Sequence, residues 1–72
     1  MKQYVICLDN KNYPVKLELR KVYEVIDDVL AAEEGFIRVI DESGEDYLYE
    51  ASRFAPVELS QEILDAFATA HA

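Results

Sequence analysis

Acidic side chains are the residues of this chain best suited to chemistry. Asp27 and Asp28 form one pair, and Glu33 and Glu34 form another. Paired carboxylates can act as general acid and base when a cleft desolvates them, but a chain of 72 residues has little concavity to do so. The sequence also has no glycine-rich phosphate loop, no cluster of Cys and His and no serine followed by a suitable base. We therefore expect a protein that is not an enzyme and needs no cofactor.

A third acidic cluster surrounds one expected turn. Asp41, Glu42, Glu45 and Asp46 are four oxygen donors at a sharp bend, the kind of ligands that calcium prefers. The cluster resembles the start of an EF-hand loop, but its glycine stands at the fourth place instead of the sixth and no late glutamate follows. We expect a solvated hairpin tip and no metal site.

The charge balance excludes several classes of partner. The chain carries 15 acidic and 7 basic residues, a net charge of −8. This sign is opposite to that of proteins that bind nucleic acid or anionic membranes, so we expect neither partner. Residues 1–23 have a net charge of +3, whereas residues 24–72 have −11. This separation could steer a basic partner, or the acids could serve only to keep the domain soluble.

A short apolar run near the start carries the one cysteine, Cys7. The run is too short for a signal peptide, and the sequence holds no stretch of about 18 apolar residues that could span a membrane. One cysteine cannot form an internal disulfide. We expect a cytoplasmic protein in which Cys7 is reduced and buried, and we expect His71 to lie in a frayed tail.

Period-two patterns and turn residues predict a mainly β domain. We expect strands over residues 3–9, 22–26, 36–41, 47–49 and 57–59, with a hairpin turn at Ser43-Gly44. Residues 15–20 also alternate and could form a half-buried strand or an extended loop arm. Single helical turns are expected near residues 29–34 and 51–54. Tyr47 and Tyr49 share one strand face with Leu48 opposite, and the sequence leaves open which aromatic face is exposed.

The end of the chain predicts a helix over residues 61–70. Ser60 is a suitable N-cap, and Glu62 lies in the first turn, where the helix dipole favours an acid. An apolar stripe of Ile63, Leu64, Phe67 and Ala68 follows at helical spacing. The stripe would pack on the domain's own strands or on a second copy, which would make a homodimer. We expect a single domain in which residues 1–59 form a five-stranded small open barrel and residues 60–72 add the C-terminal helix.

The order of these elements resembles the Src-homology-3 domain and the wider group of Src-homology-3-like small barrels. The resemblance is carried by an apolar and basic stretch over residues 17–26, by Gly35-Phe36 opening a strand, by the turn at Ser43-Gly44, and by a helical turn and last strand over residues 51–59. Residues 41–49, followed by Ser52-Arg53-Phe54, also resemble short uncharacterised proteins of bacteria and their phages.

The Src-homology-3 resemblance implies a position for a ligand site but not its usual residues. Phe36 stands where that family has its ligand-stacking tryptophan, and Ala51–Phe54 stand where it has a Pro-Ser-Asn-Tyr turn. The segment Val5–Asp9 replaces the family's Ala-Leu-Tyr-Asp-Tyr. The family binds proline-rich peptides in an aromatic groove, and this sequence lacks most of that groove.

These observations favour an adaptor or regulatory module whose partner is another protein. The residues expected to bind it are Phe36, Tyr47, Arg53, Asp27, Asp28, Glu33 and Glu34. One alternative is an acidic decoy that imitates DNA and inhibits a DNA-binding protein. Another is a structural subunit of an assembly, with the C-terminal helix as its contact.

Overall fold

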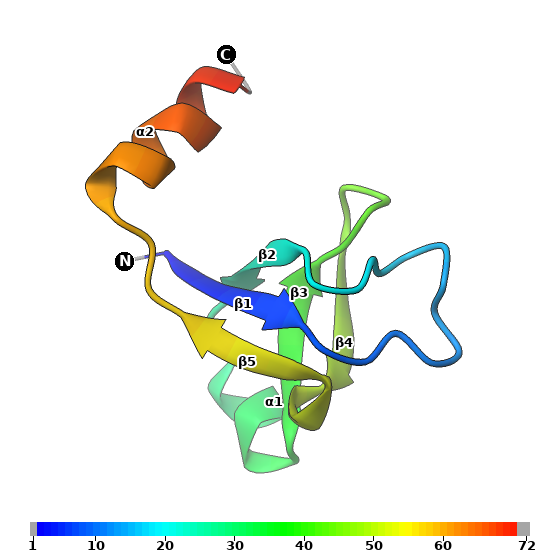
Figure 1. Ribbon diagram of the computed structural model, residues 1–72. Helices are drawn as coiled ribbons and strands as arrows, with labels where there is room; N and C mark the ends of the chain where they lie inside the picture. The colour runs from blue at the N-terminus through cyan, green and yellow to red at the C-terminus, as the bar shows by residue number, and fades with distance from the viewer. Residues whose placement is uncertain (1, 71–72) are drawn as a thin grey trace.

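Five antiparallel strands form one sheet in the order β4-β3-β2-β1-β5 (Figure 1). The structure is a computed structural model that describes residues 2–70, with the backbone alone described for residues 67–70. The strands are β1 (Gln3–Cys7), β2 (Val22–Ile26), β3 (Phe36–Ile40), β4 (Asp46–Glu50) and β5 (Phe54–Val57). Two α-helices and one 3-10 turn complete the described chain, α1 (Val29–Glu33), η1 (Ala51–Arg53) and α2 (Gln61–Ala70). The mainly β prediction is confirmed, and β4 and β5 are the two edges of an open sheet.

Capping and turn residues fix the connections around β3. The carboxylate of Asp28 accepts a hydrogen bond from Ala31 N at 3.0 Å and caps α1. Gly35 follows α1 with a φ of 80°, which favours glycine and lets the chain reverse into β3. Gly44 has a φ of 82° in the β3–β4 hairpin, so the predicted turn is confirmed.

The last strand begins earlier than the sequence predicts. The expected strand over residues 57–59 is wrong, because β5 runs over Phe54–Val57 and includes Pro56. A proline lacks the N–H that a central strand needs, but β5 is an edge strand that pairs with β1 alone. Proline is therefore compatible with this strand and does not mark its start.

Residues 8–21 form a loop with turns and not a strand. Leu17 in the middle of this loop is fully buried and covers one face of the sheet. The buried cluster consists of Val5, Cys7, Leu17, Tyr23, Val39, Tyr49 and Phe54. The predicted burial of Cys7 and the predicted alternation in β4 are both confirmed, because Tyr49 is buried and Leu48 is exposed.

Buried tyrosine hydroxyls fasten the loop and the hairpin to this core. Tyr49 Oη donates to Asp41 Oδ2 at 2.6 Å, and Tyr23 Oη donates to the carboxylate of Glu42. The same Tyr23 oxygen accepts a hydrogen bond from Glu18 N at 2.7 Å. Each hydroxyl thus has a partner, as a buried polar group requires, and residues 8–21 are tied to the β3–β4 hairpin through Tyr23.

The C-terminal helix α2 occupies the predicted residues and extends away from the sheet (Figure 1). Ile63 is exposed and Leu64 is half-buried. The side chain of Phe67, also assigned to the apolar stripe, lies outside the described part of the structure, as does His71. Neither described α-helix has the length and apolar character needed to cross a bilayer.

Candidate functional site

Exposed apolar side chains gather on the outer face of β3 and β4, opposite the buried cluster. A shallow hollow of about 500 Å³ lies there, and we call its lining the Phe36 surface: Asp28, Leu30, Ala31, Glu34, Phe36, Arg38 and Leu48. Leu30 is 75% exposed, Phe36 38% and Leu48 46%. Large apolar side chains that share one exposed site indicate an interaction surface more strongly than the same residues scattered singly.

Strand register places these side chains together. Arg38 pairs with Leu48 across β3 and β4, and Phe36 lies two residues from Arg38 on the same strand face. Leu48 is therefore the diagonal neighbour of Phe36, within reach of an aromatic ring. The helix α1, which ends just before β3, adds Leu30 to the same surface.

Arg38 lies among these apolar side chains, and its positive charge is matched by two aspartates. Its Nε donates to Asp28 Oδ2 at 3.0 Å, and its Nη1 donates to Asp46 Oδ2 at 2.9 Å. The hydrogen bond from Ala31 N and those from Arg38 hold the pKa of Asp28 below its usual value. Asp46 and Asp28 in turn raise the pKa of Arg38. These hydrogen bonds of Arg38 with Asp28 and Asp46, which we call the clamp, join α1, β3 and β4. The apolar side chains therefore lie on elements that are held together.

Unmatched negative charge borders the Phe36 surface. Asp27, Glu33 and Glu34 are exposed and make no ion pair with any other described residue. Glu34 itself lines the Phe36 surface, and Asp27 and Glu33 lie close to that surface in sequence, around the two ends of α1. An apolar patch with an acidic border suits a partner segment that combines apolar and basic side chains.

The structure brings together some of the residues expected to bind a partner and separates others. Asp28, Glu34 and Phe36 line one hollow, and Asp27 and Glu33 flank it in sequence.

Tyr47 lies on the face of β4 opposite to Leu48, the same face on which Tyr49 joins the buried cluster. Lys16 Nζ stands 3.9 Å from the centroid of its ring, and its hydroxyl donates to Glu45 at 3.0 Å. This tyrosine belongs to the surroundings of residues 8–21 and not to the Phe36 surface.

Arg53 is buried at the end of η1. Its Nη1 donates to the carbonyl oxygen of Lys11 at 2.7 Å, and its Nε donates to Glu50 at 2.9 Å. The guanidinium also lies over the ring of Tyr13, 4.9 Å from its centroid. Arg53 therefore anchors residues 8–21 to the end of β4.

Sequence reasoning missed Leu30, Arg38 and Leu48 as members of the site. A signal was present for two of them. Arg38 follows Phe36 by two residues on one strand face, and Leu48 alternates with two tyrosines. Leu30 carried no such signal, because a helix of five residues is too short to show a periodic pattern.

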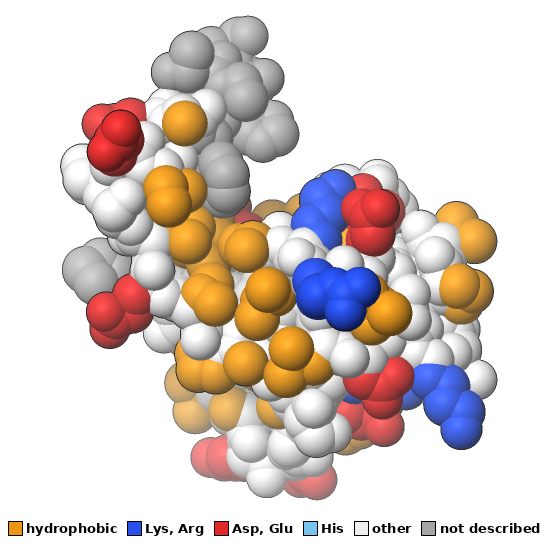
Figure 2. All heavy atoms as spheres, viewed as in Figure 1, with side chains coloured by type: hydrophobic (Ala, Val, Ile, Leu, Met, Phe, Trp, Pro, Cys, Tyr) orange, Lys and Arg blue, Asp and Glu red, His pale blue; other side chains and the backbone are white. Residues whose placement is uncertain are grey.

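A second, larger hollow lies between the sheet and the first turns of α2. Its volume is about 1560 Å³, and it takes apolar lining from Val5, Val25, Ile37, Phe54 and Pro56. Figure 2 shows apolar side chains gathered over β1 and β5 and reaching the base of α2. None of the seven residues expected to bind another protein lines this hollow, but Leu64 of the apolar stripe, expected to pack on the strands or on a second copy, does.

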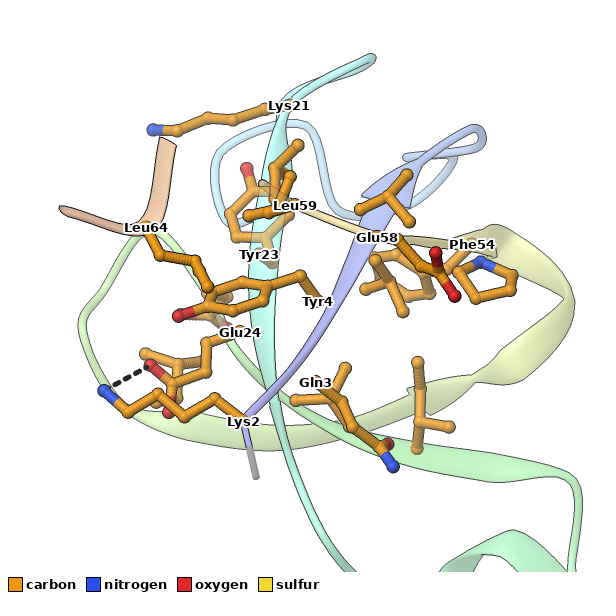
Figure 3. Close-up of a pocket in the computed structure, with 18 of the residues that line it drawn as sticks. Lys2, Gln3, Tyr4, Lys21, Tyr23, Glu24, Phe54, Glu58, Leu59 and Leu64 are labelled. Carbon is orange, nitrogen blue, oxygen red and sulfur yellow. Dashed lines mark ion pairs between the residues drawn. The ribbon is translucent and has the colours of Figure 1, made fainter. Parts of the chain in front are cut away.

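The ends of this second hollow differ in character. Leu64 of α2 and Tyr4 of β1 lie at one end, and Phe54 lies at the other (Figure 3). Lys2 forms an ion pair with Glu24 across 3.7 Å on the rim near Tyr4. The hollow has an open mouth, and its polar lining includes Lys21 and Glu42, which pair with each other at 2.8 Å.

The hairpin carboxylate of Asp41 and the thiol of Cys7 are both held within the fold. In the described part of the chain, no three His, Cys, Asp or Glu side chains are placed to hold one ion. Asp41 in the hairpin receives hydrogen bonds from Ser43 and Tyr49. Burial raises the pKa of the Cys7 thiol, which keeps it protonated and unreactive.

Comparison of the chain with protein-family models, with curated proteins and with solved structures gave no match. The candidate site therefore stands on its own geometry.

Proposed function

We propose that this protein is a non-enzymatic interaction module, built on a Src-homology-3-like small barrel, that docks another protein on the Phe36 surface. The observation that carries the proposal is the exposure of Leu30, Phe36 and Leu48 around an arginine whose charge is already matched. An apolar side chain of the partner would fill the hollow between them. Basic side chains beside it would meet the border of unpaired acids at the ends of α1.

The strand arrangement supports the barrel part of the proposal. The β3–β4 hairpin, the helical turn η1 and the last strand β5 follow one another along the chain in the order that the resemblance implies. Phe36 opens β3, the position of the family's ligand-stacking tryptophan.

Docking on the Phe36 surface is favoured because Arg38 already holds the elements that carry its apolar side chains. The hydrogen bonds of Arg38 to Asp28 and Asp46 join the three elements that carry the apolar side chains. A partner therefore meets side chains whose supports need no reordering, which lowers the entropic cost of association. Because few residues dominate most interfaces and aromatic residues are frequent among them, Phe36 is the expected centre of the binding energy.

The remaining expectations follow from charge and from the cysteine. The acidic surface disfavours direct binding to nucleic acid or to an anionic membrane. A single buried thiol suits a reducing compartment, so we place the protein in the cytoplasm.

The test is affinity capture from an extract of the cells that encode the protein, with wild type, Phe36→Ala and Ile63→Ala as baits. Ile63 is a matched control, because its side chain is 44% exposed, close to the 38% of Phe36, but it lies on α2 and not on the Phe36 surface. We expect a partner that survives a high-salt wash, is retained by Ile63→Ala and is lost by Phe36→Ala. A partner captured equally by all three baits would contradict the proposed site.

The decoy function has its own signature in the same experiment. Its supporting observation is the net charge of −11 over residues 24–72. A decoy would capture a DNA-binding protein that dissociates steeply with salt and is indifferent to Phe36→Ala. That result would replace the docking proposal.

A further inference from the structure

We infer that a second copy of this chain can occupy the Phe36 surface, with the loop of residues 8–21 as the docking segment. The inference rests on the proposed function of the Phe36 surface and names an occupant for it. Repetition of the contact would join copies head to tail.

The loop of residues 8–21 offers exposed apolar side chains together with basic ones, which complement the apolar and acidic Phe36 surface. Three of its apolar side chains face solvent: Leu8 is 56% exposed, Val15 85% and Leu19 44%. Basic residues alternate with them along the loop. We call these side chains together the loop surface: Leu8, Lys11, Val15, Lys16, Leu19 and Arg20.

The charges left unmatched on the two surfaces are opposite in sign. The loop's own acids each lie near a cation, Asp9 3.6 Å from Arg53 and Glu18 4.0 Å from Lys21, which also pairs with Glu42 at 2.8 Å. The remaining cations form no ion pair with another described residue; they are Lys11, Lys16 and Arg20. The unpaired acids are Glu34, which lines the Phe36 surface, and Asp27 and Glu33, which lie close to it in sequence. Lys11 and Arg20 are exposed and can thus meet the unpaired acids, each set beside exposed apolar side chains, whereas Lys16 is half-buried over the ring of Tyr47.

The loop is fixed in its conformation before it binds. Arg20 N donates to the carbonyl oxygen of Cys7 at 2.7 Å, and Cys7 N donates to that of Lys21 at 2.9 Å. Asn10 Nδ2 donates to the carbonyl oxygen of Leu17 at 3.0 Å, and the Leu17 side chain is fully buried. A loop pinned at its base and its middle loses little conformational entropy on docking.

The two surfaces lie on opposite faces of β4, so the loop surface of one molecule cannot contact the Phe36 surface of the same molecule. Lys16 of the loop stands over Tyr47 on the inner face, whereas Leu48 on the outer face lines the Phe36 surface. Figure 1 shows the loop and α1 in separate parts of the molecule. A contact between unlike surfaces is heterologous, and each added copy leaves one free surface of each kind.

The test measures the mass of the purified full chain by analytical ultracentrifugation over a concentration series, at low and at high salt. We expect the average mass to rise above the monomer's 8.3 kDa as concentration increases, less so at high salt. Phe36→Ala and Val15→Glu should each raise the dissociation constant at least about tenfold. Ile63→Ala, on neither surface, should associate like wild type.

Mixing the two defective variants gives the sharper result. Val15→Glu retains an intact Phe36 surface and Phe36→Ala retains an intact loop surface, so an equimolar mixture should form a 1:1 complex that grows no further. A symmetric contact between like surfaces would not be restored by mixing. Circular dichroism of each variant checks that it is folded, and since both side chains are exposed, the sheet should be unchanged.

Failure of this inference differs from failure of the proposed function. A wild-type protein that stays monomeric up to about 1 mM would overturn the inference, as would association that persists in Phe36→Ala. If affinity capture still depends on Phe36 in that case, the Phe36 surface binds a different protein. If neither experiment depends on Phe36, both proposals are wrong.

Discussion

The guanidinium of Arg38 contacts a single carboxylate oxygen of Asp28 twice, from Nε and from Nη2, each at 3.0 Å. The other oxygen of Asp28 accepts the capping hydrogen bond from Ala31 N. One aspartate thus starts α1 and binds that helix to β3, which is how the sequence sets Leu30 beside Phe36.

This relationship predicts a graded response to substitution of Asp28. Asp28→Asn keeps an oxygen that can cap α1 but loses the charge that Arg38 requires, whereas Asp28→Ala loses both interactions. We expect the urea midpoint to fall for Asp28→Asn and to fall further for Asp28→Ala. Asp27→Ala is the matched control, because Asp27 is exposed and unpaired, and its midpoint should stay near wild type. Equal midpoints for all three variants would show that the clamp does not stabilise the fold.

A second prediction concerns the attachment of the loop of residues 8–21. Leu17 is 0% exposed, whereas Leu19, two residues later, is 44% exposed. Leu17→Ala should lower the free energy of unfolding by about 2–5 kcal/mol, because it removes buried methyl groups and leaves a cavity. Leu19→Ala should change it by less than about 0.5 kcal/mol. Urea denaturation followed by circular dichroism measures both values, and a small effect of Leu17→Ala would mean that the loop is not anchored there.

A third prediction concerns acid stability. Burial acts to raise the pKa of Asp41, but hydrogen bonds from Ser43 and Tyr49 outweigh it and the pKa is lowered. Lys21 and Tyr23 lower the pKa of Glu42. A carboxyl group whose pKa is lower in the folded state contributes stability above its unfolded pKa, about 3.9 for Asp and 4.3 for Glu, and loses it as the pH falls below that value.

The urea midpoint should therefore be nearly constant from pH 7 to about pH 5 and drop between about pH 4 and pH 2. Tyr49→Phe removes one hydrogen bond to Asp41, so its midpoint should fall less steeply across the acid range than that of wild type. A midpoint that is insensitive to acid, or equal slopes for the two proteins, would contradict the assignment of Asp41.

Local patterns in the sequence were sufficient for much of the sheet. Alternation predicted β2 with its exact bounds and placed Leu48 opposite Tyr49, because each strand has one buried face and a period of two. The start of β5 was missed, since whether a strand can contain Pro56 depends on its being at an edge, which is a property of the whole sheet.

The candidate site was only partly accessible to the same reasoning. The resemblance to the Src-homology-3 domain points to Phe36, and the acidic pair that contains Asp28 points to a basic partner. Arg53 lies in the segment that the resemblance aligns with the family's Pro-Ser-Asn-Tyr turn, yet it is buried, and two of its partners are carbonyl oxygens at Asp9 and Lys11, more than 40 positions away. Such pairings are set by the tertiary fold, and no local sequence pattern predicts them.

The central claim is that the Phe36 surface, and not the larger hollow beside α2, binds the partner. The most direct test is calorimetric titration of the captured and purified partner into wild type, Phe36→Ala and Leu64→Ala, since Leu64 lines the larger hollow. We predict that Phe36→Ala weakens binding at least about tenfold while Leu64→Ala leaves the dissociation constant unchanged. Weakening by Leu64→Ala with no effect of Phe36→Ala would contradict the account and move the binding site to the larger hollow.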